Sequence, residues 1–242
     1  QAALLEAALV AAVDHGPQAP SIAISRMAVT CGLPLNGAMA SAINALDDVH
    51  GGAGEQCLAL YQRAQALCAD HSLEAAVALA LDEQTAREGK IIPGFGHRFH
   101  PVDPRSVRLM ELVAESAALG VVQGVFARIG AAVERELGRR AGKVLPMNID
   151  GATAVVYGEL GFPPPLARGL FILSRSVGIL AHAWEESQQG RRLKRPMPPD
   201  LPYDYVGARA ERVLPQLLLK LGPGRPVPNF GTLYGCVAIS RA

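Results

Sequence analysis

The sequence predicts an all-α protein, and three features of the chain support this. Half of its 242 residues are hydrophobic while only 5% are aromatic, and alanine and leucine are abundant, a composition suited to closely packed helices. Apolar residues recur at helical spacing along most of the chain. No convincing run alternates apolar and polar residues as a half-buried strand does, and no internal repeat is visible. A chain of this length fits one large domain or two small ones with a substantial core.

The helices are expected where periodicity or start signals are clearest. Asp103 is expected to cap a helix whose first position is Pro104, because a proline there loses no intrahelical hydrogen bond. Prolines 163–165 separate the last two helices, and the glycine- and proline-rich segment from about Val213 predicts an irregular arm. The expected helices cover residues 3–13, 33–46, 73–89, 103–116, 123–140, 151–160 and 166–189.

Charge and hydropathy exclude several classes of protein. The net charge is +1, from 23 basic and 22 acidic residues, so no overall field favours nucleic acid or an anionic membrane. No apolar run reaches the roughly 18 residues of a membrane span, because Arg175 interrupts the nearest candidate. The N-terminus, which begins with Gln1, shows no signal peptide pattern. We expect a cytoplasmic protein with a small-molecule partner and neither a nucleic-acid nor a membrane partner.

The cysteines predict neither a disulfide framework nor a zinc site. No two of them form a CxxC pair, and three lie in apolar, helix-like surroundings. Reduced, buried thiols are therefore expected, and no metal is expected. The four are Cys31, Cys57, Cys68 and Cys236.

The segment PGFGHRFHPVDPR, residues 93–105, concentrates turn residues and cationic chemistry. Its glycines are expected to expose backbone N–H groups, and Arg98 and Arg105 add fixed positive charge. Such a turn suits a pocket for a carboxylate or phosphate. His97 is either a loop histidine that satisfies nearby carbonyls or a member of that pocket.

Three further polar residues lie at helix ends or turns. His50 precedes Gly51-Gly52, where a histidine is either a simple helix C-cap or a functional group. Asp150, in NIDG, is either the N-cap of the next helix or a functional carboxylate. His15 lies in a DHG segment, which is consistent with a simple turn that has no functional role.

Arg175 falls inside an otherwise apolar helix. A buried guanidinium is costly unless an anion pairs with it, so its partner is either an internal Asp or Glu or a bound carboxylate. Arg195 lies in a basic run that is typical of a solvated surface. The other histidines, His71, His100 and His182, are interpreted as surface or core residues.

Together these segments resemble the citrate synthase superfamily over roughly residues 10–200. The turn PGFGHRFHPVDPR is similar to its signature, a histidine turn followed by the Arg of DPR. The remaining motifs occur in the family's order. DHGPQAPS resembles the substrate-binding His segment (His15), VHGGA the first catalytic His motif (His50), and NIDG the catalytic Asp segment (Asp150). LSRSVGILAH resembles the helix whose Arg binds a substrate carboxylate (Arg175), and KRP the Arg that crosses from the neighbouring subunit (Arg195).

Two departures place the resemblance closer to citryl-CoA lyase and the lyase module of ATP-citrate lyase. Citrate synthases carry a long helical region before the DHG segment, which is almost absent from this sequence. They also follow the aspartate with longer residues, whereas Gly151 follows Asp150 here. A third departure is Pro101, where synthases often have a Lys or Arg that contacts coenzyme A phosphate. Lys90 and Arg98 are the alternatives for that role.

The resemblance implies a citrate synthase-like fold, with a small helical domain inserted into a large one and the active site in the cleft between them. Residues 1–50 and 161–212 would form the large domain, residues 51–160 the small domain, and residues 213–242 an irregular C-terminal arm. If Arg195 reaches a neighbour's site, the protein is at least a homodimer.

The implied reaction is the cleavage of citryl-CoA to acetyl-CoA and oxaloacetate. His97 would act on the alcohol, His50 would stabilise the enolate, and Asp150, with its pKa raised by partial burial, would protonate carbon. The substrate carboxylates would bind His15, Arg105, Arg175 and Arg195. Coenzyme A, present as part of substrate and product, would bind the turn through Pro93, Gly94, Phe95, Gly96 and Arg98.

Two alternatives stay open. The same residues suit a citrate or methylcitrate synthase that condenses an acyl-CoA with oxaloacetate, because the carbon–carbon step is reversible. A non-catalytic homologue that binds coenzyme A or a partner protein belongs to another class.

Overall fold

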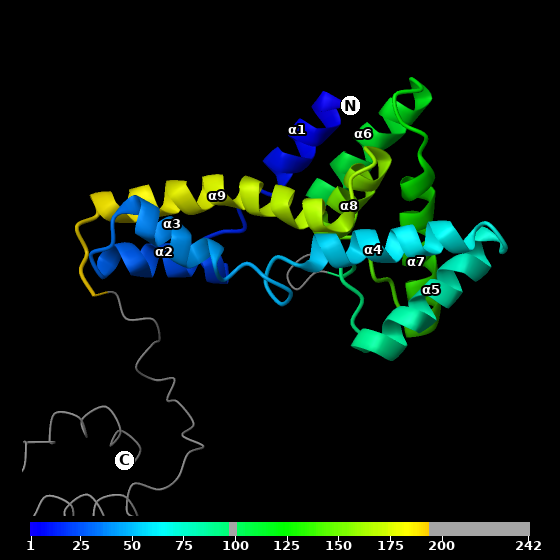
Figure 1. The fold of residues 1–242 in the computed structure, drawn as a ribbon, viewed down its shortest axis with the longest axis horizontal. Helices are drawn as coiled ribbons and strands as arrows, with labels where there is room; N and C mark the ends of the chain where they lie inside the picture. Colours follow the sequence, from blue (N-terminus) through cyan, green and yellow to red (C-terminus); the bar gives the residue numbers. More distant parts are fainter. Residues whose placement is uncertain (97–100, 194–242) are drawn as a thin grey trace, which may run out of the picture. The chain divides into compact units, whose positions relative to one another are not determined.

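The computed structural model describes residues 1–96 and 101–193, and all regular structure in these ranges is helical (Figure 1). The all-α prediction is therefore confirmed. Only two isolated β-bridges occur among the described residues, Asp47 with Gly51 and Phe95 with Met147. The helices are α1 (Ala2–Ala11), α2 (Pro20–Thr30), α3 (Leu35–Ile43), α4 (Ala53–Leu67), α5 (Leu73–Glu88), α6 (Pro104–Ala118), α7 (Val125–Ala141), α8 (Ile149–Glu159) and α9 (Pro164–Gln188).

The structure corrects the expected helices in two ways. α2 and α4 were not expected, although α2 begins with a proline at its first position and α4 follows Gly52 directly. α1 and α3 are shorter than the expected helices at 3–13 and 33–46, and each buries only two residues, Leu4 and Ala8 in α1 and Ala38 and Ala42 in α3. The expected cap of α6 is confirmed, because the Asp103 side chain accepts a hydrogen bond from the N–H of Arg105.

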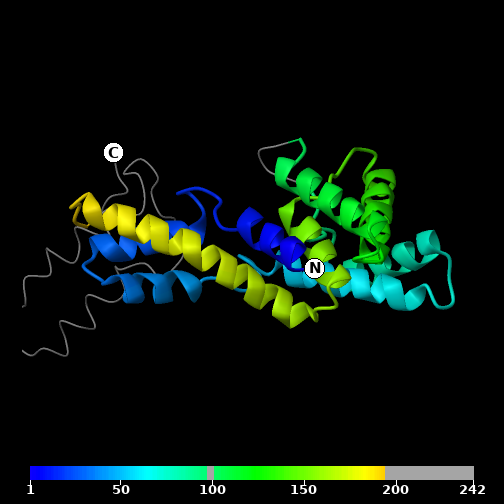
Figure 2. The ribbon, with the colours of Figure 1, turned by 90° about the horizontal axis from the view of Figure 1, so that it is seen from above.

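The described helices pack around two hydrophobic clusters. The larger cluster contains residues of α1, of all five helices from α4 through α8, and of the start of α9. Tyr61, Leu81 and Val155 are fully buried in it. The smaller cluster contains Ile22 and Ile179 and joins α2 and α3 to the second half of α9. α9 is 25 residues long and contributes residues to both clusters. Figures 1 and 2 show it running past α2 and α3 at one end and α4 at the other.

Two connections pass between the clusters beside α9. Residues 12–19 join α1 to α2, and residues 44–52 join α3 to α4. They carry His15 and His50, so the packing of the helices determines where both histidines lie. The division into a large and a small domain stays a prediction, and the expected arm at 213–242 lies outside the described residues.

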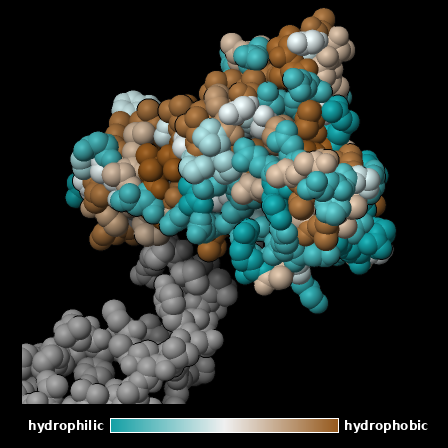
Figure 3. All heavy atoms as spheres, turned by 45° about the vertical axis from the view of Figure 1, so that its right-hand side comes forward, coloured by the Kyte–Doolittle hydropathy of each residue, from teal (hydrophilic) through white to brown (hydrophobic). Residues whose placement is uncertain are grey.

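α9 is the one helix in the described ranges whose length and composition would allow it to cross a membrane. The same composition occurs in long core helices, and α9 packs against α1, α2, α3 and α4. Its exposed apolar residues form a stripe on one face: Leu166, Leu173, Val177, Leu180 and Trp184. Figure 3 shows apolar side chains, in brown, that reach the surface among hydrophilic ones.

The cysteines only partly follow expectation. Cys57 is buried under the 93–96 turn, where burial raises the pKa of its thiol to about 12. Cys31 and Cys68 are exposed, so their predicted burial was wrong, because both stand at the C-terminal ends of helices. Cys236 lies outside the described residues.

Two glycines of α9 test how closely this helix packs on the first connection. A Cβ at Gly178 would lie 2.2 Å from the carbonyl oxygen of Val13, while a Cβ at Gly169 would meet nothing within 4 Å. We expect Gly178→Ala to lower the free energy of unfolding by about 1–3 kcal/mol through overpacking. Gly169→Ala is expected to raise it by about 0.5–1 kcal/mol, because alanine favours the helix. Urea unfolding of both variants measures this, and equal effects would show that the close contact is absent.

Candidate functional site

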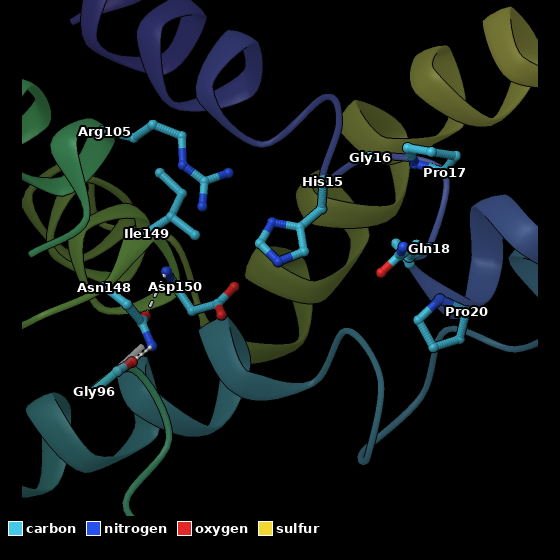
Figure 4. Close-up of a pocket in the computed structure, with 11 residues that line it drawn as sticks. His15, Gly16, Pro17, Gln18, Pro20, Gly96, Arg105, Asn148, Ile149 and Asp150 are labelled. Atoms are coloured by element: carbon cyan, nitrogen blue, oxygen red, sulfur yellow. Dashed lines mark hydrogen bonds between the residues drawn. The ribbon is translucent and has the colours of Figure 1, made fainter. Parts of the chain in front are cut away.

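A cavity of about 530 Å³ opens between the first connection and the N-termini of α6 and α8. His15 to Pro20 form one wall, and Gly96, Arg105 and Asn148 to Asp150 form the other. In Figure 4 the side chains of His15, Arg105 and Asp150 face the same space. Residues that are far apart in the sequence, and that were singled out separately from it, therefore line one cavity.

Asp150 owes its position to the cap of α8. Asn148, and not Asp150, is the N-cap, and its side-chain oxygen accepts hydrogen bonds from the N–H groups of Asp150 (2.9 Å) and Gly151 (3.3 Å). The interpretation of Asp150 as a plain cap was therefore wrong. Its carboxyl group stands in the first turn of the helix, where the partial positive charge of the N-terminus favours a negative group.

The 93–96 turn is bound to the same helix start through its backbone. Gly96 N–H donates to the carbonyl of Pro146 (2.7 Å), and Asn148 N–H donates to the carbonyl of Gly94 (3.0 Å). The Asn148 side chain adds a third bond, from Nδ2 to the carbonyl of Gly96 (2.8 Å). The N–H of Gly96 is thus already used within the protein, so the expectation that it is exposed for an anion was wrong.

Asp103 joins the N-termini of α6 and α8. Only 1% of this residue is exposed, and its Oδ2 accepts hydrogen bonds from Ile149 N–H (3.1 Å) and from Nη2 of Arg105 (2.9 Å). Nε of Arg105 donates to the other carboxylate oxygen at 3.0 Å. Burial alone would raise the pKa of Asp103, but the Arg105 guanidinium and the backbone N–H groups outweigh it and lower the pKa. Arg105 is therefore held at the cavity by a bidentate ion pair.

His50 is held by the start of α2. Its Nε2 accepts a hydrogen bond from the backbone N–H of Ser21 at 3.1 Å, and Ser21 Oγ lies 3.0 Å away. A ring nitrogen that accepts carries no proton, so the neutral ring bears its proton on Nδ1. Burial, and then the charges of Arg175 and His15, lower the pKa of His50. Near neutral pH, His50 is thus an uncharged hydrogen-bond donor.

Arg175 is buried beside these groups, with 5% of its surface exposed. Its Nε donates to the carbonyl of Ala12 at 3.1 Å, and its guanidinium lies 4.9 Å from the centre of the Phe171 ring. Burial lowers the pKa of Arg175, while the charges of Asp150 and Asp14 raise it. The positive charge of Arg105 also lowers the pKa of Arg175. Arg175 therefore interacts electrostatically with two groups that line the cavity, Arg105 and Asp150.

Most of the chain matches a known protein family. A family model described as "Citrate synthase, C-terminal domain" matches residues 1–197. The chain belongs to the citrate synthase family. It is 34% identical over 182 residues to a citrate synthase of Heyndrickxia coagulans, across 74% of this chain and 44% of that protein.

Solved structures of the family include lyases and synthases. Citryl-CoA lyase from Hydrogenobacter thermophilus superposes with a TM-score of 0.71 at 30% identity, covering 95% of this chain and 80% of the lyase. Citrate synthase from Thermotoga maritima gives a TM-score of 0.63 at 27% identity, covering 86% and 55%. The chain spans about half the length of the citrate synthases that it matches in sequence. The predicted superfamily, its likeness to citryl-CoA lyase and the citrate synthase-like fold are confirmed.

The structure places most, but not all, of the site residues predicted for this family member. His15, Gly96, Arg105 and Asp150 line the cavity, and His50 and Arg175 lie next to it. His97, Arg98 and Arg195 lie outside the described residues, so their roles stay predictions. No group of three His, Cys, Asp or Glu side chains that could hold a metal ion occurs in residues 1–96 and 101–193.

Sequence reasoning missed three residues that organise this site. Asn148 had a local signal, since asparagine directly before an apolar helix is a common N-cap. Asp103 was recognised as a cap, but not as the partner of Arg105 or of α8. Ser21 had no signal, because its contact with His50 joins residues that are distant in the chain.

Asn148 is expected to stabilise both α8 and the 93–96 turn. Asn148→Ala should lower the free energy of unfolding by about 0.5–2 kcal/mol through loss of the cap alone, and by more because the bond to Gly96 is lost as well. Asn148→Ser can still cap the helix but is too short to reach Gly96, so its loss should be smaller. Urea unfolding measures both variants, and a serine variant as unstable as the alanine variant would contradict the role of the cap.

The lowered pKa of His50 predicts how stability depends on pH. In the unfolded chain a histidine titrates near 6.5, above its value in the folded protein. The stabilisation from keeping His50 neutral is fully present above that pH and is lost as the pH falls through the window below it, where the unfolded state binds more protons. Relative to His50→Asn, the wild type should therefore lose stability between pH 7.5 and 5.5. The prediction is contradicted if the free energies of unfolding of the wild type and of His50→Asn differ by the same amount at both pH values.

Proposed function

We propose that this protein is a citryl-CoA lyase, which cleaves citryl-CoA to acetyl-CoA and oxaloacetate. The observation that carries the proposal is the cavity, where Asp150, His15 and Arg105 face one space beside a neutral His50. The lyase direction is supported by the superposition on the Hydrogenobacter thermophilus citryl-CoA lyase, which has a TM-score of 0.71 and 30% identity, against 0.63 and 27% for the Thermotoga maritima citrate synthase.

The difficult step is the break of a carbon–carbon bond. A base removes the proton from the tertiary alcohol, its oxygen becomes the ketone of oxaloacetate, and the electrons of the broken bond pass to the acetyl-CoA fragment as an enolate. We assign the base to His97 from its place in the family signature. In this direction Asp150 reacts as its protonated carboxylic acid, although the helix N-terminus favours the carboxylate, and it gives its proton to the enolate carbon, so that the two proton transfers balance.

His50 suits the stabilisation of the enolate. Since its Nε2 is occupied by Ser21, the ring can donate only through Nδ1–H, and it does so without a positive charge of its own. A fixed donor aimed at the thioester oxygen strengthens its hydrogen bond as charge develops there. Its lowered pKa keeps the ring uncharged near neutral pH, and the bond from Ser21 N–H to Nε2 keeps the single proton on Nδ1.

The substrate carboxylates match the cationic groups around the cavity. Arg105 is oriented by Asp103, and Arg175 is oriented by the Ala12 carbonyl. A guanidinium held in this way loses little freedom when a carboxylate binds. His15 adds a donor on the opposite wall, and Arg195 is assigned to a neighbouring subunit's site, which would make the protein at least a dimer.

The coenzyme A portion is assigned to residues 93–98 on the resemblance to the family. Two solved structures of ATP-citrate lyase that share this fold hold citryl-CoA, or citrate with coenzyme A. Because the N–H of Gly96 already donates to the carbonyl of Pro146, Gly96 would contact coenzyme A by van der Waals packing and not by a hydrogen bond from its N–H.

The synthase direction is the second candidate, and the sequence relatives support it. They include citrate synthases and a 2-methylcitrate synthase of Shewanella oneidensis, 31% identical over 168 residues. The same residues would serve, since Asp150 would remove the acetyl methyl proton in that direction. The distinction lies in which substrates the purified protein turns over.

Purified protein should release oxaloacetate from citryl-CoA, followed through a coupled NADH signal. Asp150→Asn is expected to lower kcat by about 10²–10⁴-fold, because it removes the proton donor to carbon. Asp70→Asn provides the same chemical change at an exposed position between α4 and α5 and should have no effect.

Other outcomes reassign the protein. Citrate formation from acetyl-CoA and oxaloacetate, without cleavage of citryl-CoA, would assign it as a synthase. Binding of coenzyme A or citrate without turnover in either direction would assign it as a non-catalytic homologue.

A further inference from the structure

One face of α9 carries three polar residues at seven-residue intervals: Arg168, Arg175 and His182. Seven residues are close to two helical turns, so the three side chains share one side of the helix. Each contacts a segment that carries a histidine of the site. Arg175 is part of the proposed substrate site, but Arg168 and His182 have no role in it.

Arg168 binds the segment that surrounds His50. Its Nη1 lies 2.5 Å from Oδ1 of Asp47, and its remaining nitrogens bind Asp48 and Glu55. These carboxylates lie on both sides of His50 in the chain, two before it and one after it. Without the guanidinium, three negative charges would face one another in a single short segment.

The loop at His50 is held tightly at other points as well. Asp47 N–H donates to the carbonyl of His50 at 2.9 Å, which closes the loop on itself. A Cβ at Gly51 would lie 3.0 Å from the Phe171 ring of α9, so the loop packs directly on the helix. A shift of Asp47 or Asp48 would therefore be transmitted to the His50 ring.

His182 binds the segment that carries His15. Arg26 Nη1 lies 3.1 Å from Nδ1 of His182, and because a guanidinium can only donate, Nδ1 accepts. The proton of the neutral ring is then on Nε2, which lies 3.3 Å from Oδ1 of Asp14. Arg26 is itself fixed by ion pairs with Glu185 and with Glu186, the latter at 2.6 Å.

Asp14 passes this constraint on to His15. Its carboxylate accepts hydrogen bonds from the backbone N–H groups of His15 and Gly16. Burial would raise the pKa of Asp14, but these bonds and His182 together lower it. The backbone from which the His15 side chain enters the cavity is thus tied to His182 of α9 through the Asp14 carboxylate.

We propose that Arg168 and His182 are positioning residues, Arg168 for His50 and His182 for His15, so that one helix aligns the two histidine segments of the site. The inference rests on the proposed function only for what the two histidines do. Their placement is a property of the folded chain and can be measured without substrate.

The test is a crossed comparison of two variants by NMR of the histidine rings in the full chain. The signals are assigned with His15→Asn and His50→Asn. Arg168→Gln should shift the His50 signal and move its titration towards that of a free histidine, while the His15 signal stays in place. His182→Leu should do the reverse. Arg63→Gln, which breaks the exposed bidentate pair with Glu83 on α4 and α5, should move neither.

Kinetics provide the second measurement. Arg168→Gln should lower kcat by about ten- to a hundredfold, because a small misplacement of the enolate donor weakens the transition state. His182→Leu should raise KM by about tenfold, the scale of one hydrogen bond to a charged group. His182→Gln retains a donor for Asp14 and should recover most of this loss. Arg168→Lys cannot bridge three carboxylates and should recover little.

The outcomes are separable. If both histidine signals move together in each variant, or if neither moves, the positioning role is wrong. Should Arg168→Gln or His182→Leu fail to fold, the same NMR comparison is made with Arg168→Lys and His182→Gln. If the wild type turns over no substrate in either direction, the proposed function is wrong, while the NMR comparison still decides the positioning role.

Discussion

A Cβ added to Gly151 would lie 2.5 Å from the carbonyl oxygen of Gly94, and one added to Gly94 would lie 2.6 Å from the sulfur of Cys57. This close approach of the 93–96 turn to the first turn of α8 leaves no room for a side chain on either glycine. Asn148 and Asp103 then complete the junction, because Asn148 donates to Gly96 of the turn and Asp103, the cap of α6, accepts from Ile149 N–H of α8. Asp150 and Arg105 reach the cavity from the two helices that meet there.

The glycine after Asp150 therefore has a structural reason beside its value as a family marker. Here it is the position that lets the turn approach the helix. A longer side chain would push the 93–96 turn away from α8, so the geometry of the site and the identity of this residue are coupled.

α9 has an unusual distribution of polarity. The face that meets the two connections carries Arg168, Arg175 and His182, whereas the opposite face exposes apolar side chains such as Leu173 and Trp184. Polar residues on the inner face are stable because each meets a carboxylate, a carbonyl or a ring. The helix therefore does more than complete the two clusters, since its inner contacts hold the segments from which the histidines project.

Periodicity, the Asp103-Pro104 start and the scarcity of alternating runs were enough to predict an all-α chain, since these signals act within a few residues. α2 and α4 escaped prediction because glycine, proline and polar residues near their starts also indicate loops. The ordered motifs identified the family and named His15, His50, Arg105, Asp150 and Arg175 as site residues. Only the tertiary structure decided that Asn148 binds the carbonyl of Gly96, that Ser21 fixes the tautomer of His50 and that α9 binds both histidine segments. Each of these depends on contacts between residues far apart in the chain, and no local pattern encodes such a distance.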